Sequence, residues 1–267
     1  MRGYLKVYPG VKTLNVVTML LVEFTGMLAL AWWSVSMIFY FQNQLNIPTK
    51  DLQRVSSNGI SIVVIGSIFL QCVIGFVYDT HGRKTPIIVF LAISTLALSS
   101  FPFLKNEQEF YYAAVFMMML PIVNTNPFVA DLILKESHGI GNMLRSNSIN
   151  LSSLSAYALL MANASYPDLF SNDFIYLCLT SMMLLVTILV IVGMKDIVKE
   201  QLKTERVTSG YVFKQSYNLI KTEPIILLGI TGSVIQLCTK IIGNNTTTLA
   251  IQYYFSHSLE NDHETSI

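Results

Sequence analysis

The most tightly grouped charged side chains lie between residues 75 and 86, where Asp79 is followed closely by Arg83 and Lys84. A carboxylate and a guanidinium at this spacing can form an ion pair across a tight turn. Such chemistry holds two segments together and makes no covalent bond. The spacing therefore predicts a charged latch, and the alternative interpretation is an ordinary short loop whose basic residues only set membrane topology.

Small residues around these charges favour a rigid hairpin between two helices. Gly82 is expected to supply the positive φ that a tight turn needs, because glycine has no Cβ to clash there. Pro86 is placed at the start of the following helix. Gly75 lies one turn before the end of the preceding apolar run, where it allows a neighbouring backbone to approach closely.

Two ionisable residues stand inside long apolar runs. Glu23 lies nine residues into the first run, about 14 Å deep at the rise of an α-helix. A charge at such a depth is costly unless it is paired, protonated or hydrated, so Glu23 is a candidate functional residue. The alternative is a structural Glu that is protonated or hydrogen-bonded to a neighbouring helix. Lys240 lies about 24 Å deep in a later run, and the difference of about 10 Å disfavours a direct pair with Glu23.

Polar uncharged side chains form further clusters within apolar runs. Asn124 and Asn126 stand between two prolines, where they can satisfy freed backbone groups or contact a solute. Asn244 and Asn245, followed by three threonines, form the second candidate cluster for a solute. Three small residues spaced by four are expected to form a helix-packing stripe and not a site: Ser148, Ser152 and Ala156.

Membrane-length helices have to position these residues. The chain is 52% hydrophobic and 12% charged, with a mean hydropathy of +0.53, whereas soluble proteins carry about 25% charged residues. A bilayer core of about 30 Å needs about 20 helical residues. Seven stretches qualify: 14–41, 56–78, 86–104, 110–133, 142–164, 174–194 and 225–255. The fifth has a first half rich in Ser and Asn, so it can span only where protein or a wet cavity covers its polar side.

The distribution of Lys and Arg predicts the orientation in the membrane. Thirteen of these residues fall before the first stretch or after the second, fourth and sixth, and three fall on the opposite side. Arg145 is counted among the thirteen as part of the loop after the fourth stretch. The positive-inside rule then places the N-terminus in the cytoplasm and the acidic tail after residue 255 outside.

Several classes of function are disfavoured. With 17 basic and 16 acidic residues, the chain gives no sign of nucleic-acid binding. The three cysteines lie in apolar runs and are expected to be small buried hydrophobes, without a disulfide framework or a metal site. The few Asp, Glu, His and Ser residues do not form a nucleophile and base set. No enzyme activity, cofactor or metal is therefore expected.

The segment Gly75-Phe-Val-Tyr-Asp79-Thr-His-Gly82-Arg83-Lys84 resembles the signature loop between the second and third helices of the major facilitator superfamily. The usual form of that loop is G-x-x-x-D-[RK]-x-G-R-[RK]. The one departure is a threonine where the family usually carries a basic residue.

A second segment, Ala130-Asp131-Leu-Ile-Leu-Lys-Glu-Ser-His138-Gly139, is similar to the loop between helices four and five of the same superfamily. That loop commonly reads A-[DE]-x-x-P-x-x-x-R-G, so Leu134 replaces the frequent proline and His138 the usual arginine. Histidine titrates near neutrality. If His138 takes the role of the arginine, a contact with Asp131 or Glu136 is expected to depend on pH.

The resemblance implies an all-α membrane protein with a six-helix bundle at 1–194, a cytoplasmic linker at 195–223, and the first helix of a second, incomplete bundle with an external tail at 224–267. It implies alternating-access transport of a small solute, in some members with a coupling proton, in which Glu23 and the polar clusters are site candidates. The resemblance leaves the substrate class open. Half a transporter is not expected to transport alone, and a separate C-terminal half is a possible partner besides the lipid bilayer. The alternatives are a non-transporting membrane scaffold or regulator, and a seven-helix receptor, which the predicted cytoplasmic N-terminus disfavours.

Overall fold

The computed structural model describes residues 5–117 and 126–194, together with residues 217, 218, 221, 222, 231, 232, 235 and 239. For several residues between 49 and 80, and for 126–128, only the backbone is described. Over the two continuous stretches the chain is all-α, as predicted, with one isolated bridge between Val7 and Ile133. The elements are α1 (Thr13–Asn43), α2 (Thr49–His81), α3 (Lys84–Ser100), the short 3-10 helix η1 (Phe101–Phe103), α4 (Glu107–Met117), α6 (Asn126–Leu132), the 3-10 helix η2 (Lys135–Ser137), α7 (His138–Ser165) and α8 (Asn172–Gly193).

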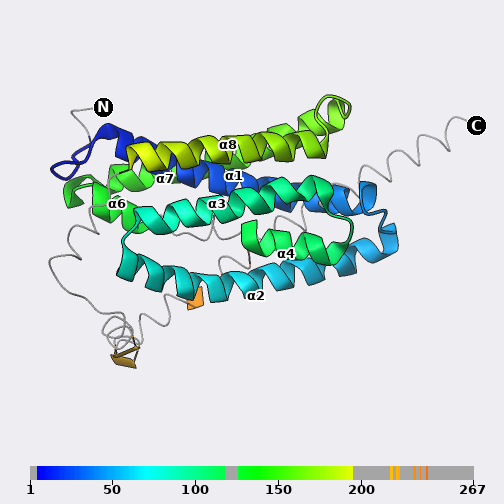
Figure 1. Ribbon diagram of the computed structural model, residues 1–267, viewed down its shortest axis with the longest axis horizontal. Helices are drawn as coiled ribbons and strands as arrows, with labels where there is room; N and C mark the ends of the chain where they lie inside the picture. The colour runs from blue at the N-terminus through cyan, green and yellow to red at the C-terminus, as the bar shows by residue number, and fades with distance from the viewer. Residues whose placement is uncertain are drawn as a thin grey trace, which may run out of the picture.

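The long helices lie side by side along one common direction (Figure 1). Their connections gather at two ends of the molecule. At the polar end lie the start of α1, the α2–α3 turn, the α6–α7 connection and the last turn of α8. At the aromatic end lie the α1–α2, α3–α4 and α7–α8 connections.

Helices occupy the positions of the first six predicted stretches, with residues 118–125 of the fourth outside the described part. Three of the described helical spans are long and apolar enough to cross a membrane: Thr13–Asn43, Lys84–Phe103 and Asn172–Gly193. α2 and α7 are long enough but carry more polar residues, which for α7 fill the first half, as expected from the sequence. Apart from isolated residues, the predicted linker and the seventh stretch lie outside the described residues.

The turn between α2 and α3 has the predicted backbone. Gly82 follows the last residue of α2 with φ 81°, in the region that glycine adopts without strain. Pro86 is the third residue of α3, where its missing N–H is not needed because the first four N–H groups of a helix have no intrahelical partner. Both predictions for this turn are confirmed.

α1 is the central helix of the described fold. All residues from 31 to 38 are buried, and Trp32 and Trp33 are fully enclosed. α7 packs along α1 more extensively than any other pair of described elements, and α8, α2 and α4 cover other parts of it. A helix that is apolar on all sides lies in a protein core or in a membrane, and α1 is the one whose neighbours cover most of it.

Aromatic rings bind the helices together at the aromatic end. The rings of Phe101 and Tyr176 stack with centroids 4.7 Å apart, and those of Tyr40 and Phe110 lie 4.8 Å apart. The Tyr40 hydroxyl donates a 2.7 Å hydrogen bond to the carbonyl of Phe101. This cluster joins α1, η1, α4 and α8 by large buried surfaces.

Cys178 corrects one expectation from the sequence. This residue was expected to be buried like the other cysteines in apolar runs, but on α8 it is exposed. α8 turns only one face to α1 and α3, and its outer face presents apolar side chains such as Leu184 and Leu185. An apolar run that faces lipid carries the same composition as one that faces protein, so the sequence does not separate the two cases.

Two glycines near the start of α7 provide a matched test of packing. A Cβ at Gly141 would lie 2.6 Å from Ile133 Cδ1 and 2.9 Å from Val129 Cγ1, whereas a Cβ at Gly139 meets nothing within 4 Å. Gly141→Leu should lower the free energy of unfolding by about 1–3 kcal/mol because the side chain overpacks the α6–α7 contact. Gly139→Leu should raise stability by up to about 1 kcal/mol through helix propensity. Thermal unfolding of the two purified variants checks the difference, and equal effects would contradict the packing at Gly141.

Candidate functional site

An ion pair at the polar end joins the two segments that sequence analysis singled out. Arg83 Nε lies 2.9 Å from Asp131 Oδ2, and the two side chains are 14% and 22% exposed. The Arg83 guanidinium also lies over the ring of Tyr78, 5.3 Å from its centroid, which is cation–π geometry. The turn after α2 is thereby fixed to the end of α6.

Arg83 has a described partner besides the one expected from the spacing, whose pairing with Arg83 stays a prediction. Asp79 was expected to pair with Arg83, but only the backbone of Asp79 is described, within α2, as is that of Gly75. The described carboxylate on Arg83 is Asp131, 48 residues away in the sequence. A local pattern cannot reveal that partner, because the approach of α6 to the turn is a tertiary contact.

Two further contacts tie the polar end to the last turn of α8. The Lys84 ammonium donates a 2.7 Å hydrogen bond to the carbonyl of Ile191. The Asn15 amide donates a 2.8 Å hydrogen bond to the carbonyl of Gly193. These carbonyls belong to the end of a helix and have no partner within it, so Lys84 and Asn15 act as caps supplied by α3 and α1.

Residues 5–11 form an N-terminal strap across the connection between α6 and α7. The Tyr8 amide donates to the carbonyl of Leu132 at 3.1 Å, and the Leu134 amide donates to the carbonyl of Lys6 at 3.0 Å. In Figure 1 the strap is the dark blue segment beside α6. The strap therefore adds a short piece of backbone pairing to the same connection that holds Asp131.

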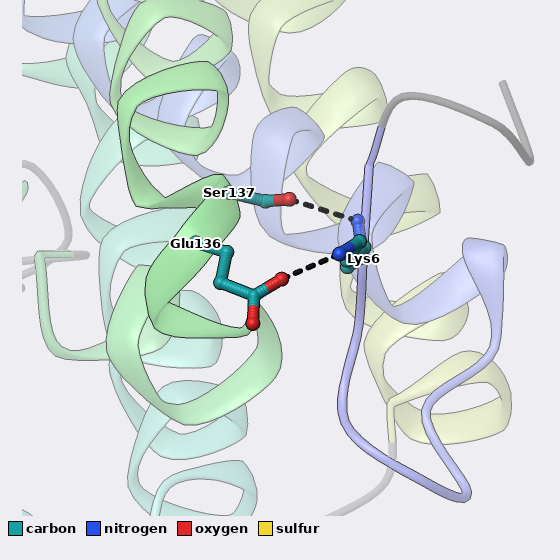
Figure 2. A network of polar contacts seen from close by, with 3 residues as sticks. All are labelled: Lys6, Glu136 and Ser137. Carbon is teal, nitrogen blue, oxygen red and sulfur yellow. Dashed lines mark hydrogen bonds and ion pairs between the residues drawn. The ribbon is translucent and has the colours of Figure 1, made fainter.

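The side chain of Lys6 extends this attachment, as Figure 2 shows. Its ammonium lies 2.5 Å from Glu136 Oε2, and its backbone N–H donates a 3.1 Å hydrogen bond to the hydroxyl of Ser137. The hydrogen bond to Lys6, helped by its positive charge, lowers the pKa of Glu136 below its ordinary 4.5. The same contact raises the pKa of Lys6 above its ordinary 10.5. Both side chains are largely exposed, so water and salt screen the pair.

His138 does not make the carboxylate contact expected for it. Its Nε2 lies 2.9 Å from the carbonyl oxygen of Ile133, and both Asp131 and Glu136 already have basic partners. His138 is the first residue of α7, where it closes the α6–α7 connection through the backbone. Gly139, the next residue of the motif, is exposed.

A second ion pair lies deeper, between α1 and α7. Arg145 Nη2 is 3.0 Å from Glu23 Oε1, with side-chain exposures of 22% and 6%. Nearby, the hydroxyl of Ser148 donates a 2.9 Å hydrogen bond to the carbonyl of Leu20. Glu23 is therefore a paired carboxylate, and the predicted stripe of small residues packs against α1, with Ser152 and Ala156 fully buried.

Arg145 is the charged residue whose position sequence analysis missed. It was assigned to a loop, but α7 begins at His138, which places Arg145 about 10 Å along the helix. The signal that could have located it is Glu23 in the first stretch. A buried Glu is costly without a basic partner, and Arg145 is a basic residue that falls within the predicted stretch 142–164.

Two buried indole groups are further candidates for contact with a solute. In the described part of the chain neither Trp32 Nε1 nor Trp33 Nε1 has a hydrogen-bond acceptor. A buried donor without a partner costs about 1–3 kcal/mol, so an acceptor on a bound molecule can compensate it. Of the candidates named from the sequence, Asn126 is described by backbone alone in α6, and the others lie outside the described residues: Asn124, Lys240, Asn244 and Asn245.

A double-mutant cycle tests the ion pair at the polar end. Arg83→Ala and Asp131→Ala should each lower stability by about 1–3 kcal/mol, because each removes the described ion pair of a largely buried charge. The double variant should lose less than the sum, by about 1–2 kcal/mol. Arg83→Ala combined with Glu136→Ala is the control, since Glu136 is paired elsewhere and its effect should add. Additivity in the Arg83 and Asp131 cycle, measured by thermal unfolding, would contradict direct coupling.

The attachment of the strap should depend on pH. Because the pKa of Glu136 is lowered in the folded chain, its ion pair stabilises the attached strap at pH values above the ordinary pKa of 4.5. This stabilisation is lost as the pH falls through the lowered pKa. The contribution of Lys6, whose pKa is raised, is lost only as pH rises beyond 10.5. Hydrogen exchange of the Tyr8 amide, corrected for its intrinsic rate, should accelerate at the acid end. Glu136→Gln should exchange faster at neutral pH and lose this acid dependence; an unchanged profile would show that the ion pair does not hold the strap.

The sequence matches no protein-family model and shows no significant similarity to a curated protein. What supports a function is therefore the set of contacts described above: the ion pairs that join segments at the polar end, and one buried ion pair between α1 and α7. Among the described residues, no group of three side chains is arranged to hold a metal ion. The arrangement joins helix ends at the polar end and places a carboxylate against a guanidinium between α1 and α7.

Proposed function

We propose that the chain is a multi-pass integral membrane protein that forms one bundle of a secondary transporter of the major facilitator type, which moves a small solute by alternating access. The observation that carries this proposal is the ion pair between Arg83 and Asp131. Each residue comes from a segment that resembles a loop of that superfamily, and the two loops were identified separately from the sequence. Their direct contact supports treating them as two parts of one device.

In this proposal the polar end is the cytoplasmic end of the bundle. Among the described loops and helix ends, the polar end carries five basic residues, Lys6, Lys12, Arg83, Lys84 and Lys135, and the aromatic end carries three, Lys50, Arg54 and Lys105. This asymmetry agrees with the positive-inside rule. The contacts of Arg83, Lys84 and Asn15 then act as a latch, and their loss shifts the balance between inward-facing and outward-facing states by the energy of the latch.

The pair of Glu23 and Arg145 is the proposed element of proton coupling. Arginine stays charged at all accessible pH values, whereas a carboxylate can take up a proton. Protonation of Glu23 removes the attraction to Arg145 and weakens the contact between α1 and α7, so proton uptake changes the packing of the central helix. The indole N–H groups of Trp32 and Trp33, on the same helix, are enclosed in the described arrangement, so they can donate to a solute only after the helices around α1 separate.

Uptake into proteoliposomes tests the proposal on the full chain. We expect no saturable uptake when chains are dilute in lipid, because one bundle provides one wall of a cavity. At high protein-to-lipid ratio, where copies meet, saturable uptake of one of the screened classes is expected: sugars, organic ions, amino acids or phosphate. Absence of uptake at every ratio would reject transport by this chain and favour a non-transporting membrane regulator. Uptake by isolated monomers would reject the half-transporter part of the proposal.

Glu23→Gln tests the coupling role of the buried pair. The variant keeps the shape of the side chain and removes the titrating group, so uptake should become nearly equal at about pH 5 and about pH 8. Glu136→Gln is the matched control, because it makes the same change at an exposed ion pair and should keep the pH dependence of the parent chain. An unchanged dependence in Glu23→Gln would assign Glu23 a structural role.

A further inference from the structure

The outward face of α7 carries a regular seam of exposed side chains. Successive members are separated by alternating steps of four and three residues, an average period of 3.5 that keeps a row of side chains turned toward a neighbouring helix. This row is distinct from the face with Gly141, Ser152 and Ala156, which is buried. The exposed row is the α7 seam: Met143, Asn147, Asn150, Leu154, Tyr157 and Met161.

Two amides in this seam need partners. Asn147 and Asn150 are exposed, and neither makes a hydrogen bond within the described part of the chain. Hydroxyl groups on other faces of α7 do have acceptors, as Ser148 has on Leu20. In hydrocarbon an unsatisfied amide is costly, and α7 is not among the described helices apolar enough to cross a membrane by themselves. The seam therefore requires polar groups of protein or water beside it, and lipid alone does not supply them.

We infer that the α7 seam packs against the same seam of a second copy of this chain. The inference rests on the membrane insertion included in the proposed function, because two copies inserted with the same topology have parallel α7 helices. A two-fold axis along the membrane normal then sets each seam residue against its own equivalent. An asparagine amide carries both donors and an acceptor, so Asn147 and Asn150 can each hydrogen-bond to the identical side chain.

The charge distribution on α7 favours this self-association. Between residues 139 and 165 the one charged side chain is Arg145, and it is paired with Glu23 of α1. The seam thus brings no like charges together. Its amides lie in the half nearer the polar end, and Leu154, Tyr157 and Met161 continue it as an apolar contact toward the aromatic end. Amides of this kind in a helix seam fix register and the number of chains that associate.

The consequence for the proposed transporter is a second wall. Two bundles related by a two-fold axis along the membrane normal have the arrangement of the parallel halves found in transporters built from repeats.

Cysteine cross-linking of the full chain in native membranes tests the seam. The native cysteines are replaced by serine and single cysteines are introduced one at a time. Oxidation should give disulfide-linked dimers from cysteine at positions 147, 150 and 154. It should give few dimers from position 151, which is exposed on α7 outside the seam, or from position 96, which is exposed on α3. Equal cross-linking at all five positions would mean random collision and would overturn the inference.

A second measurement uses side-chain truncation. The variant Asn147→Ala/Asn150→Ala should reduce the association constant by about tenfold, measured by energy transfer between labelled copies diluted with lipid in vesicles. Asn142→Ala is the matched control, because Asn142 is an exposed amide of α7 that lies outside the seam, and it should leave association unchanged. Alanine has a higher helix propensity than asparagine and is less polar, so these substitutions favour both the helix and its insertion into lipid. A loss of association would therefore not reflect misfolding, and circular dichroism measures whether the helix content is unchanged.

The remaining outcomes separate this inference from the proposed function. Monomers whose seam cysteines are protected from a membrane-permeable maleimide would show that other residues of the same chain or lipid cover α7, and that overturns the inference. Monomers with reactive seam cysteines would overturn it in favour of a water-filled cavity, because maleimide reacts with the thiolate, which forms in contact with water. Seam-specific dimers without uptake of any solute would keep the inference and reject transport. A chain that alkaline carbonate removes from membranes would reject both.

Discussion

The burial of α1 is the constraint on which the rest of the structure depends. This helix is enclosed over much of its length, yet it carries Glu23, which is only 6% exposed. A carboxylate in such a place needs a partner within reach, and Arg145 provides it from α7. The pair fixes the position of α7 along the axis of α1. The hydrogen bond from the Ser148 hydroxyl to the Leu20 carbonyl, close by, holds the two helices in the same register. The other helices then fill the remaining sides of α1.

The two ends of the molecule are held by different kinds of interaction. Rings at the aromatic end interlock over large buried areas. Moving any one ring away would leave a gap in this close-packed cluster. At the polar end the helices are held by a few directional contacts, several of them partly exposed, which water can replace. Relative movement of the helices should therefore start at the polar end and pivot about the aromatic end.

The helices and the α2–α3 turn were predictable because their causes are local. Run length and composition indicate the helices, and Gly82 with Pro86 identifies the turn. Arg83 and Asp131 were both recognised as candidates, but their pairing was not, since it depends on how α6 approaches the turn. Arg145 was misplaced because the start of α7 among small and polar residues has no strong local signal. The N-terminal strap has no sequence signature at all, as its backbone pairs with residues more than a hundred positions away.

The separation of the buried ion pair along the chain has a consequence for biosynthesis. Glu23 precedes Arg145 by 122 residues, and ribosomes add about 5–20 residues per second. For roughly 6–24 seconds at that speed, α1 has emerged and its carboxylate still lacks its permanent neighbour. During this interval Glu23 has to be neutralised by a proton, shielded by water, or held by the insertion machinery. The polar first half of α7 then meets a site already prepared for its guanidinium. In the proposed membrane protein, α1 would thus act as the template on which the less apolar α7 is retained.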